Sequence, residues 1–492
     1  MEPKFRFDDA VFTYAVAPEP AARFSRHTPV MNGALTVSHT SKTDVLTAGD
    51  GVREIAVIGL CVDAHGEAAR EDIPALCLER PGHDILSVYR FCDRFAGKYV
   101  ILYRNGEGVY LFGDASGSVQ INYSIGEDGL CAASIDRLAA EYRGYGVSEY
   151  SLKIRKGANL FQALPNDITM YDGVKALLPN HYLDVSRGQA VRVPHLPAPG
   201  FPDGAGGEEA LRAYVEAASL PLIRHTVRAF QKYYELVCPL TAGSDSRAVL
   251  SFLLDGGRPE CYTFHHKDFT GETAELRIPA EICRDLHLPY TAVKDLQAPE
   301  AYVKAVFEAA GDYHAPGTVD LAYTYLSAFS GKAMVNGDII GQVGKSSKGK
   351  DIPCAFARAP FFASKIHNKS PLARRELERY IQEIRASGDW PFVFDLYATE
   401  IMNGRWSAQT HMLYSLCSIS LLNIFNCREL IGQWMDIPRA RRTRGLIHQA
   451  VLEETRPELL RYPVNPGEKH SLLRKHWLTY YLASHVKFYF FE

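Results

Sequence analysis

The segment "LVCPLTAGSDSRAVLSFLL", residues 236–254, places a short run of small polar residues between two apolar runs. Its polar run, 241–246, is followed by a basic residue; the residues with potential chemistry are Thr241, Ala242, Gly243, Ser244, Asp245, Ser246 and Arg247. A glycine lets the backbone approach an anion closely, and the N–H groups at a helix N-terminus favour phosphate. The hydroxyls would donate hydrogen bonds, the carboxylate of Asp245 could hold Mg²⁺, and Arg247 adds a cation. The loop therefore predicts a phosphate-binding turn.

The same spacing has a purely structural interpretation. Ser and Asp are common residues at helix N-termini, so Ser244, Asp245 or Ser246 could simply cap the helix that follows. Capping and phosphate binding are compatible, because both use the first turn of the helix. The residues alone leave both interpretations open.

A second loop, "GDIIGQVGKSSKGK" at 337–350, contains Gly344-Lys345-Ser346 and invites comparison with a Walker A motif. That motif needs a glycine five positions before Gly344, where this chain has Ile339. The motif therefore fails at its first residue. We expect Lys345, Lys348 and Lys350 to belong to a mobile basic loop that acts as a lid over phosphates.

Several elements must position these loops. Continuous apolar strands alternate with helical patterns; the strands are expected in "ELVCPL", "ECYTFHH", "YTAV" and "KAMVNGD". Strands that are apolar on both faces and separated by helices indicate a parallel sheet covered by helices. Ligands bind beyond the carboxyl ends of such strands, which is where 241–246 falls. From about residue 355 the pattern is mostly helical.

The preceding part of the chain is rich in strand patterns. "GKYVILYRNGEGVYLFGDASG", residues 97–117, has two alternating runs around Asn105-Gly106, which is a strong hairpin signal. Pro and Gly crowd together in "PHLPAPGFPDGAGG" and indicate a linker. We therefore expect an N-terminal domain over 1–195, a linker over 196–207 and a second domain over 208–492.

Composition narrows the functional classes. The chain has 492 residues, of which 47% are hydrophobic, and its formal net charge is -3. This balance gives no general reason to expect binding to nucleic acid or to a membrane. The N-terminal residues lack a secretory pattern and no apolar run would span a bilayer, so a cytoplasmic protein is expected. The 10 cysteines lack the spacing of a zinc site.

The segment "LTAGSDSR" resembles the pyrophosphatase loop of the asparagine synthetase superfamily, whose pattern is Ser-Gly-Gly-x-Asp-Ser. Gly243, Asp245 and Ser246 match that pattern, whereas Thr241 and Ala242 depart from it. Further along, "CYTFHHKD" resembles the strand that contacts adenine and "MVNGD" the strand that ends in Ser-Gly-Glu. The resemblance implies an adenine-nucleotide (PP-loop) synthetase domain, with Phe264 and Gly337 at the nucleotide and Asp338 as a second magnesium ligand beside Asp245.

Upstream, "FAGKYVILYRNGEGVYLFGDASGSVQINYS" resembles the core hairpin of the family's glutaminase domain, which implies an N-terminal amidohydrolase-like β-sandwich. Two departures follow from the comparison. The family's glutaminase nucleophile is a cysteine at the N-terminus, and no cysteine precedes Cys61 here, so glutamine hydrolysis is not expected. The family's Asp-Glu pair after Ser-Gly-Glu falls on Gly341-Gln342.

This combination is similar to β-lactam synthetases, carbapenam synthetases and lasso-peptide cyclases, in which the substrate supplies the amine. It implies an AMP-forming ligase that depends on ATP and Mg²⁺ and adenylates the carboxylate of a small molecule or a peptide. One process in which such a ligase could act is peptide or natural-product maturation, together with a maturation partner protein. Two alternatives stay open. One is an inactive relative that binds a nucleotide or peptide, and the other is amidation with free ammonia.

Two charged residues complete the predicted site. Lys469 lies where the family places a lysine beside the leaving pyrophosphate, and Arg461 is its substitute. The amine step needs a general base, for which Glu400 is the candidate carried forward; the other candidates are His265, His266 and Tyr323.

Overall fold

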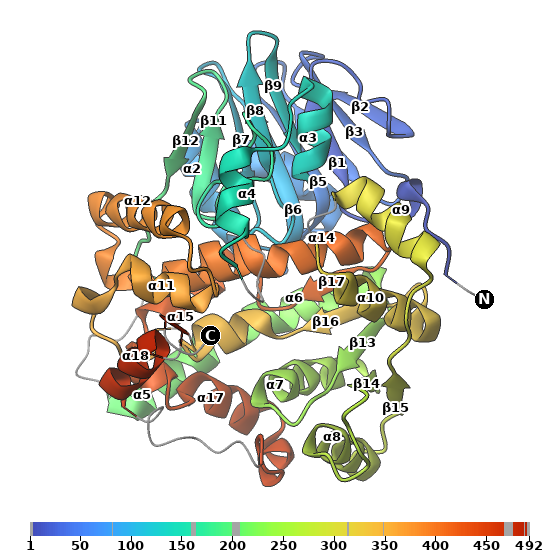
Figure 1. The fold of residues 1–492 in the computed structure, drawn as a ribbon, viewed down its shortest axis with the longest axis vertical. Helices are drawn as coiled ribbons and strands as arrows, with labels where there is room; N and C mark the ends of the chain where they lie inside the picture. The colour runs from blue at the N-terminus through green and yellow to red at the C-terminus, as the bar shows by residue number, and fades with distance from the viewer. Residues whose placement is uncertain are drawn as a thin grey trace.

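The computed structural model describes residues 3–80, 82–158, 164–198, 207–311, 314–347, 349–466, 476–486 and 488–489. Its N-terminal part contains two antiparallel six-stranded sheets, and its C-terminal part contains a parallel five-stranded sheet surrounded by helices (Figure 1). This mixed α/β architecture agrees with the predicted fold class. Lys348 and Lys469 lie outside the described residues. The boundaries at 195 and 208 stay predictions.

The two N-terminal sheets have their strands in these orders. The first consists of β10 (Lys175–Ala176), β8 (Asn122–Gly126), β9 (Gly129–Ala133), β1 (Tyr14–Ala17), β3 (Leu35–His39) and β2 (Arg26–Val30). The second consists of β12 (Gln189–Arg192), β11 (His181–Asp184), β7 (Val109–Gly113), β6 (Phe95–Arg104), β5 (Glu54–Asp63) and β4 (Val45–Gly49). The central strands β5 and β6 are buried along almost their whole length. Helices α1 (Ile73–Glu79) and α2 (Ile85–Phe91) contribute to the apolar cluster on one of their faces.

The predicted hairpin joins β6 to β7, and Arg104 pairs with Val109 at its end. The Asn105 side chain forms the turn, since its Oδ1 accepts hydrogen bonds from the N–H groups of Glu107 at 2.9 Å and Gly108 at 3.1 Å. This confirms the hairpin prediction. The short helix α3 (Asp136–Arg143) ends at Gly144, which is in the left-handed conformation. Helix α4 (Glu149–Arg155) follows it.

The parallel sheet has the order β15 (Tyr290–Lys294), β14 (Glu260–His265), β13 (Leu236–Pro239), β16 (Ala333–Asn336) and β17 (Leu421–Asn423). Strand β13, which comes first in the sequence among these five, therefore lies in the middle of the parallel sheet. Four strands lie where the apolar runs predict them. The fifth, β17, falls within the stretch interpreted as helical and was missed, because three residues are too few to show a strand pattern.

Helices connect and cover these strands. Before β16 they are α5 (Gly207–Tyr214), α6 (Leu220–Tyr233), α7 (Ser244–Leu253), α8 (Ala274–Asp285), α9 (Glu300–Ala310) and α10 (Pro316–Phe329). After it they are α11 (Ala359–Lys365), α12 (Pro371–Ser387), α13 (Val393–Leu396), α14 (Ala408–Leu416), α15 (Arg428–Asp436), α16 (Arg439–Arg442), α17 (Leu446–Thr455) and α18 (Trp477–Val486). Within the described residues, no helix has the length and apolar character needed to cross a membrane.

The segment after β17 joins the two parts of the chain. Cys427 forms a β-bridge with Ala96 of β6, and the Asn426 carbonyl accepts a hydrogen bond from the Gly97 N–H at 3.2 Å. The Asn426 amide donates to the buried carboxylate of Asp114 at 2.9 Å. Helix α14 runs across the middle of the molecule between the antiparallel strands and the parallel sheet (Figure 1). The segment after β17 therefore connects the N-terminal sheets to the parallel sheet through backbone and side-chain hydrogen bonds.

Candidate functional site

The loop 241–246 lies between the carboxyl end of β13 and the start of α7. Gly243 is the N-cap of α7, with an extended backbone (φ -78°, ψ 162°), and no side chain caps this helix. The interpretation of Ser244, Asp245 or Ser246 as the cap is therefore wrong. Ser246 Oγ instead accepts a hydrogen bond from the Thr241 N–H at 3.0 Å. The first turn of α7 thus keeps N–H groups that no side chain of the described residues caps, as an anion site requires.

Thr241 and Ala242 depart from the family pattern, and each has a structural role. Thr241 Oγ1 lies 3.0 Å from Ser246 Oγ and accepts the Gly243 N–H at 3.2 Å, so it holds the loop closed. Ala242 is fully buried, and its N–H donates to the Glu275 carboxylate in the first turn of α8 at 2.9 Å. Both substitutions therefore preserve a tight loop.

Arg247 is oriented differently from the prediction. It is only 1% exposed, and its guanidinium donates to the carbonyl groups of Ala242 at 2.8 Å, Tyr462 at 2.7 Å and Pro463 at 2.6 Å. The Asn465 N–H also donates to the Ala242 carbonyl, at 3.2 Å. The sequence suggested that Arg247 would face a phosphate, but the structure directs it to backbone carbonyl groups instead. It ties the loop to the segment 459–465 near the C-terminus.

Asp245 is engaged by two basic side chains. Lys345 Nζ lies 2.6 Å from Asp245 Oδ1, and His448 Nε2 lies 2.7 Å from the same oxygen. Burial alone would raise the pKa of the Asp245 carboxyl, but the hydrogen bonds from His448 and Lys345 and the charge of Lys345 outweigh it and lower that pKa to about 2. Burial also lowers the pKa of His448, which favours a neutral imidazole donating from Nε2. Asp245 is therefore an ionised carboxylate whose Oδ1 is shared by Lys345 and His448.

Gly341, where the resemblance would place an acidic residue, packs against Asp245. A Cβ atom at Gly341 would lie 2.4 Å from Asp245 Oδ2, and one at Gly337 would lie 3.1 Å from the Asp245 carbonyl oxygen. The two glycines thus let the segment after β16 pack directly against the loop. Gly337 lies beside the loop, and its role at the nucleotide stays a prediction.

These residues do not fit the predicted magnesium site. Lys345 and His448 share Oδ1 of Asp245, and Gly341 offers no carboxylate. Asp338 is exposed and accepts a hydrogen bond from the Asn336 amide at 3.0 Å. The part of the chain that the structure describes contains no group of three or more His, Cys, Asp or Glu side chains able to hold a metal ion. The Asp245–Asp338 pair is therefore not a preformed metal site.

The basic loop after β16 is also different from the expectation of a mobile lid. Residues Ile340–Gly344 form a buried π-helical turn, and the Arg442 guanidinium donates to the Val343 carbonyl at 2.6 Å. Lys345 is consequently held by packed backbone and points to Asp245. Among described residues it is the lysine of this loop that contacts the site, and Lys350 lies over the Tyr480 ring at 4.4 Å.

The adenine side of the predicted site is formed by the end of β14. Phe264 is half-buried there, and the next side chains are held in place: His265 Nε2 contacts the Phe269 carbonyl at 3.0 Å and His266 Nδ1 contacts Asp295 at 2.8 Å. Thr263 Oγ1 donates to the Leu240 carbonyl at 2.6 Å and links β14 to the residue just before the loop 241–246. The carboxyl ends of neighbouring strands therefore bring Phe264, Gly337 and the 241–246 loop to one edge.

Glu400 is not brought to this edge by its polar contacts. It is fully buried in a π-helical segment, Tyr397–Ser407, and binds Arg192 of β12 through both carboxylate oxygens, at 2.7 and 2.9 Å. The Asn180 amide donates to it at 2.9 Å. This geometry makes Glu400 a link to the N-terminal part instead of a base for an amine. Tyr323 is buried against Tyr302, and Arg461 is exposed.

Sequence reasoning missed His448. The residue lies in the apolar helix α17, where nothing in the spacing links it to a loop about 200 residues earlier. Lys345 was noted for a different role. A half-buried carboxylate at a helix start gives reason to look for a basic partner, but the sequence does not say which one.

No known protein family and no curated protein matches the sequence. Among solved structures, the glutamine phosphoribosylpyrophosphate (PRPP) amidotransferase from B. subtilis, complexed with ADP and GMP, is similar over 70% of this chain and 72% of that chain. The sequence identity is 11% and the TM-score is 0.24. A likeness this weak supports no argument about activity, so the function rests on the geometry of the site.

Proposed function

We propose that this protein is an ATP-dependent ligase that activates a carboxylate as its adenylate and transfers the acyl group to an amine. The observation that carries the proposal is the uncapped N-terminus of α7 at the carboxyl end of the central strand β13. Backbone N–H groups at such a position bind phosphate, and neighbouring loops of the sheet edge bind the rest of the nucleotide.

The proposed chemistry has two steps. The substrate carboxylate attacks the α-phosphorus of ATP, which forms an acyl-adenylate and releases pyrophosphate; an amine then displaces AMP and forms the amide. Pyrophosphate carries several negative charges, so fixed N–H groups and a nearby ammonium stabilise its departure. Lys345 is the described cation closest to the loop that can play this part, and Lys469 remains the sequence-based candidate. Any Mg²⁺ would be carried by the phosphates of ATP, since Asp245 is already engaged.

A second candidate function is nucleotide binding without turnover. It is favoured by the contacts of Lys345 and His448 with Asp245, which occupy one oxygen of the carboxylate. Under this alternative ATP would bind at the same edge, but no carboxylate would be activated.

Substrate-dependent exchange of labelled pyrophosphate into ATP separates the two candidates. Purified protein is tested with a panel of small carboxylic acids and peptides, and AMP is measured alongside. Exchange with AMP formation supports the ligase. ATP binding without exchange for any member of the panel supports the binding protein, and absence of ATP binding contradicts both.

The matched variants are Asp245→Asn and Asp72→Asn, the second being an exposed carboxylate outside the site. The first variant should lower the exchange rate by at least about 100-fold, because it removes the charge that fixes Lys345 and His448. The control should leave the rate unchanged. An unaltered rate in folded Asp245→Asn protein would contradict the proposed site.

A further inference from the structure

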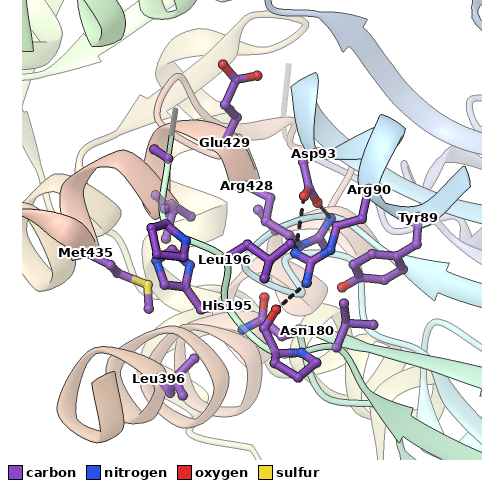
Figure 2. Close-up of a pocket in the computed structure, with 17 residues that line it drawn as sticks. Tyr89, Arg90, Asp93, Asn180, His195, Leu196, Leu396, Arg428, Glu429 and Met435 are labelled. Carbon is purple, nitrogen blue, oxygen red and sulfur yellow. Dashed lines mark hydrogen bonds and ion pairs between the residues drawn. The ribbon is translucent and has the colours of Figure 1, made fainter. Parts of the chain in front are cut away.

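A pocket lies where the N-terminal part of the chain meets helix α15. Its volume is about 250 Å³. Its walls come from α2, the residues just after it, the strap 193–198 that follows β12, and α15 (Figure 2). The strap is held by contacts of His195 Nε2 and the Ala198 N–H with the Asp436 carboxylate, each at 2.7 Å. The pocket is therefore a feature of the packed junction.

The polar side of the pocket contains two arginines that share one carboxylate. Asp93 lies 3.6 Å from Arg90 and 3.4 Å from Arg428 (Figure 2). Glu429, the other lining acid, is paired with His65 at 2.7 Å, and Figure 2 shows its carboxylate turned away from the arginines. Burial also raises the pKa of the Asp93 carboxyl, because it makes the ionised form less favourable. The polar side consequently has an excess of positive charge.

Two other buried arginines of this chain, Arg94 and Arg442, are paired more closely with a carboxylate. Arg94 binds Asp63 through two contacts of 2.8 Å, and Arg442 binds Asp395 at 2.8 and 2.7 Å. By contrast, Arg90 and Arg428 contact Asp93 only at 3.6 and 3.4 Å. One terminal nitrogen of each donates to a backbone carbonyl, that of Pro194 and that of Gly113. Nε of each has no hydrogen-bond partner among the described residues, as is also the case for Arg247. A buried guanidinium with unused donors is costly unless something accepts its hydrogen bonds. The pocket arginines therefore have spare capacity for an anion.

Tyr89 supplies a third unused donor. The residue is fully buried, its hydroxyl has no partner in the described part of the chain, and Figure 2 shows that hydroxyl directed towards the centre of the pocket. The Arg428 guanidinium lies over its ring, 4.7 Å from the centroid. Burial raises the pKa of Tyr89 to about 12, so the hydroxyl remains a donor at neutral pH.

The remaining walls are apolar. They are formed mainly by Val193, Leu196, Leu396, Ile431 and Met435. An apolar cavity of roughly 150 Å³ is large enough for benzene, so this pocket has room for a ring or a short aliphatic chain plus a carboxyl group. Apolar walls with a few fixed polar groups are typical of small-molecule sites.

We propose that this pocket binds a compact organic carboxylate, whose carboxyl group meets Arg90 and Arg428 and whose apolar body fills the rest of the pocket. This pocket is distinct from the loop 241–246, and its proposed ligand does not depend on the proposed ligase chemistry. Reorienting a guanidinium from Asp93 towards the ligand would use the donors that the protein leaves unpaired.

The test uses the full chain without nucleotide. Binding of benzoate, phenylacetate, butyrate and free leucine is measured by calorimetry and by ligand-observed NMR, and each acid is compared with its uncharged amide. At least one acid should bind with a Kd below about 1 mM, and its amide should bind at least about tenfold more weakly, because charge-assisted hydrogen bonds are lost. Failure of all four acids to bind below 10 mM would overturn the proposal, as would equal binding of acid and amide.

Two pairs of variants place the binding in this pocket. Arg90→Gln should weaken the acid at least about tenfold, whereas Arg80→Gln, an exposed arginine outside the pocket, should not. Leu196, which lines the pocket and is 61% exposed, can be changed without disturbing the core. Leu196→Asp should weaken the acid by repulsion at least about fivefold, whereas Leu86→Asp, 47% exposed and outside the pocket, should leave it unchanged. Binding that is unaffected by both pocket variants would overturn the assignment.

Discussion

The ammonium group of Lys345 lies 2.6 Å from the carboxylate of Asp245, in a loop that the sequence relates to phosphate binding. The lysine belongs to the segment after β16 and the aspartate to the first turn of α7, so the contact joins two neighbouring strand ends of the parallel sheet. It places a fixed cation beside the uncapped helix N-terminus.

Replacing Lys345 tests whether this cation supports nucleotide binding. Lys345→Met should lower the affinity for ATP by at least about tenfold, because a partly buried charge beside the phosphates is lost. The affinity is measured by fluorescence of a ribose-labelled ATP analogue. Lys304→Met, an exposed lysine of α9, is the control and should bind as the unmodified protein does. Equal affinity of both variants would remove Lys345 from the site.

Gly341 should tolerate no side chain. Gly341→Ala would bring a methyl group to 2.4 Å from Asp245 Oδ2, so the Lys345–Asp245 contact must shift. We expect a destabilisation of about 1–3 kcal/mol, as for other overpacked sites, together with weaker ATP binding. Gly317→Ala is the matched helical control, since a Cβ there meets nothing within 4 Å. Urea denaturation of the two variants compares them, and equal midpoints would show that the contact is not tight.

Arg247 should stabilise the segment 459–465 more than the rest of the fold. Arg247→Met removes three charged hydrogen bonds, to the carbonyl groups of Ala242, Tyr462 and Pro463. A loss of about 2–4 kcal/mol is expected from such a change. Hydrogen exchange followed by mass spectrometry should show faster exchange in that segment, while the exposed control Arg258→Met should not. Uniform acceleration across the chain would instead indicate global destabilisation.

Lys98 makes stability depend on pH. It is 1% exposed, its Nζ lies 3.0 Å from His411 Nδ1, and burial lowers the pKa of Lys98 to about 7. Because the unfolded chain keeps a lysine pKa near 10.4, the folded protein loses its proton first. The cost of burial is therefore present in full below pH 7 and disappears as the pH rises towards 10.

Lys98→Met should remove that dependence. At pH 7 the variant is expected to be more stable by on the order of 2 kcal/mol, and the gain should shrink between pH 7 and pH 10. Urea unfolding at several pH values measures the difference. The exposed residue Lys42 gives the control variant Lys42→Met, which should show no such pH-dependent gain. A constant difference at all pH values would mean that Lys98 is charged in the folded protein.

Much of the fold is predictable from local patterns. Asn105-Gly106 between two alternating runs fixes a hairpin, and the apolar run ending at Pro239 fixes the middle strand of the parallel sheet. In both cases neighbouring residues carry the information. The strand Leu421–Asn423 is different, since three residues inside a helical region become a strand only because Met334–Asn336 offers an open edge.

The site follows the same division. The loop 241–246 and Gly337 are recognisable because their positions follow from strand ends. The orientation of Arg247 and the pairing of Asp245 with His448 depend on segments about 200 residues away, and no local pattern encodes such contacts. Glu400 shows the converse error, because a buried acid in a helix is as readily a structural partner of Arg192 as a base.

The hydrogen bonds that Asn426 makes with Gly97 and Asp114 impose an order on biosynthesis. The ribosome releases the N-terminal strands more than 300 residues before it releases the amide that donates to the Gly97 carbonyl. The Asp114 carboxylate already accepts hydrogen bonds from Ser116, Ser118 and Val119. During that interval the N–H and carbonyl groups of Gly97 in β6 lack their partner, which favours premature association. Chaperone occupancy of the growing chain should accordingly persist until β17 and the residues after it have emerged.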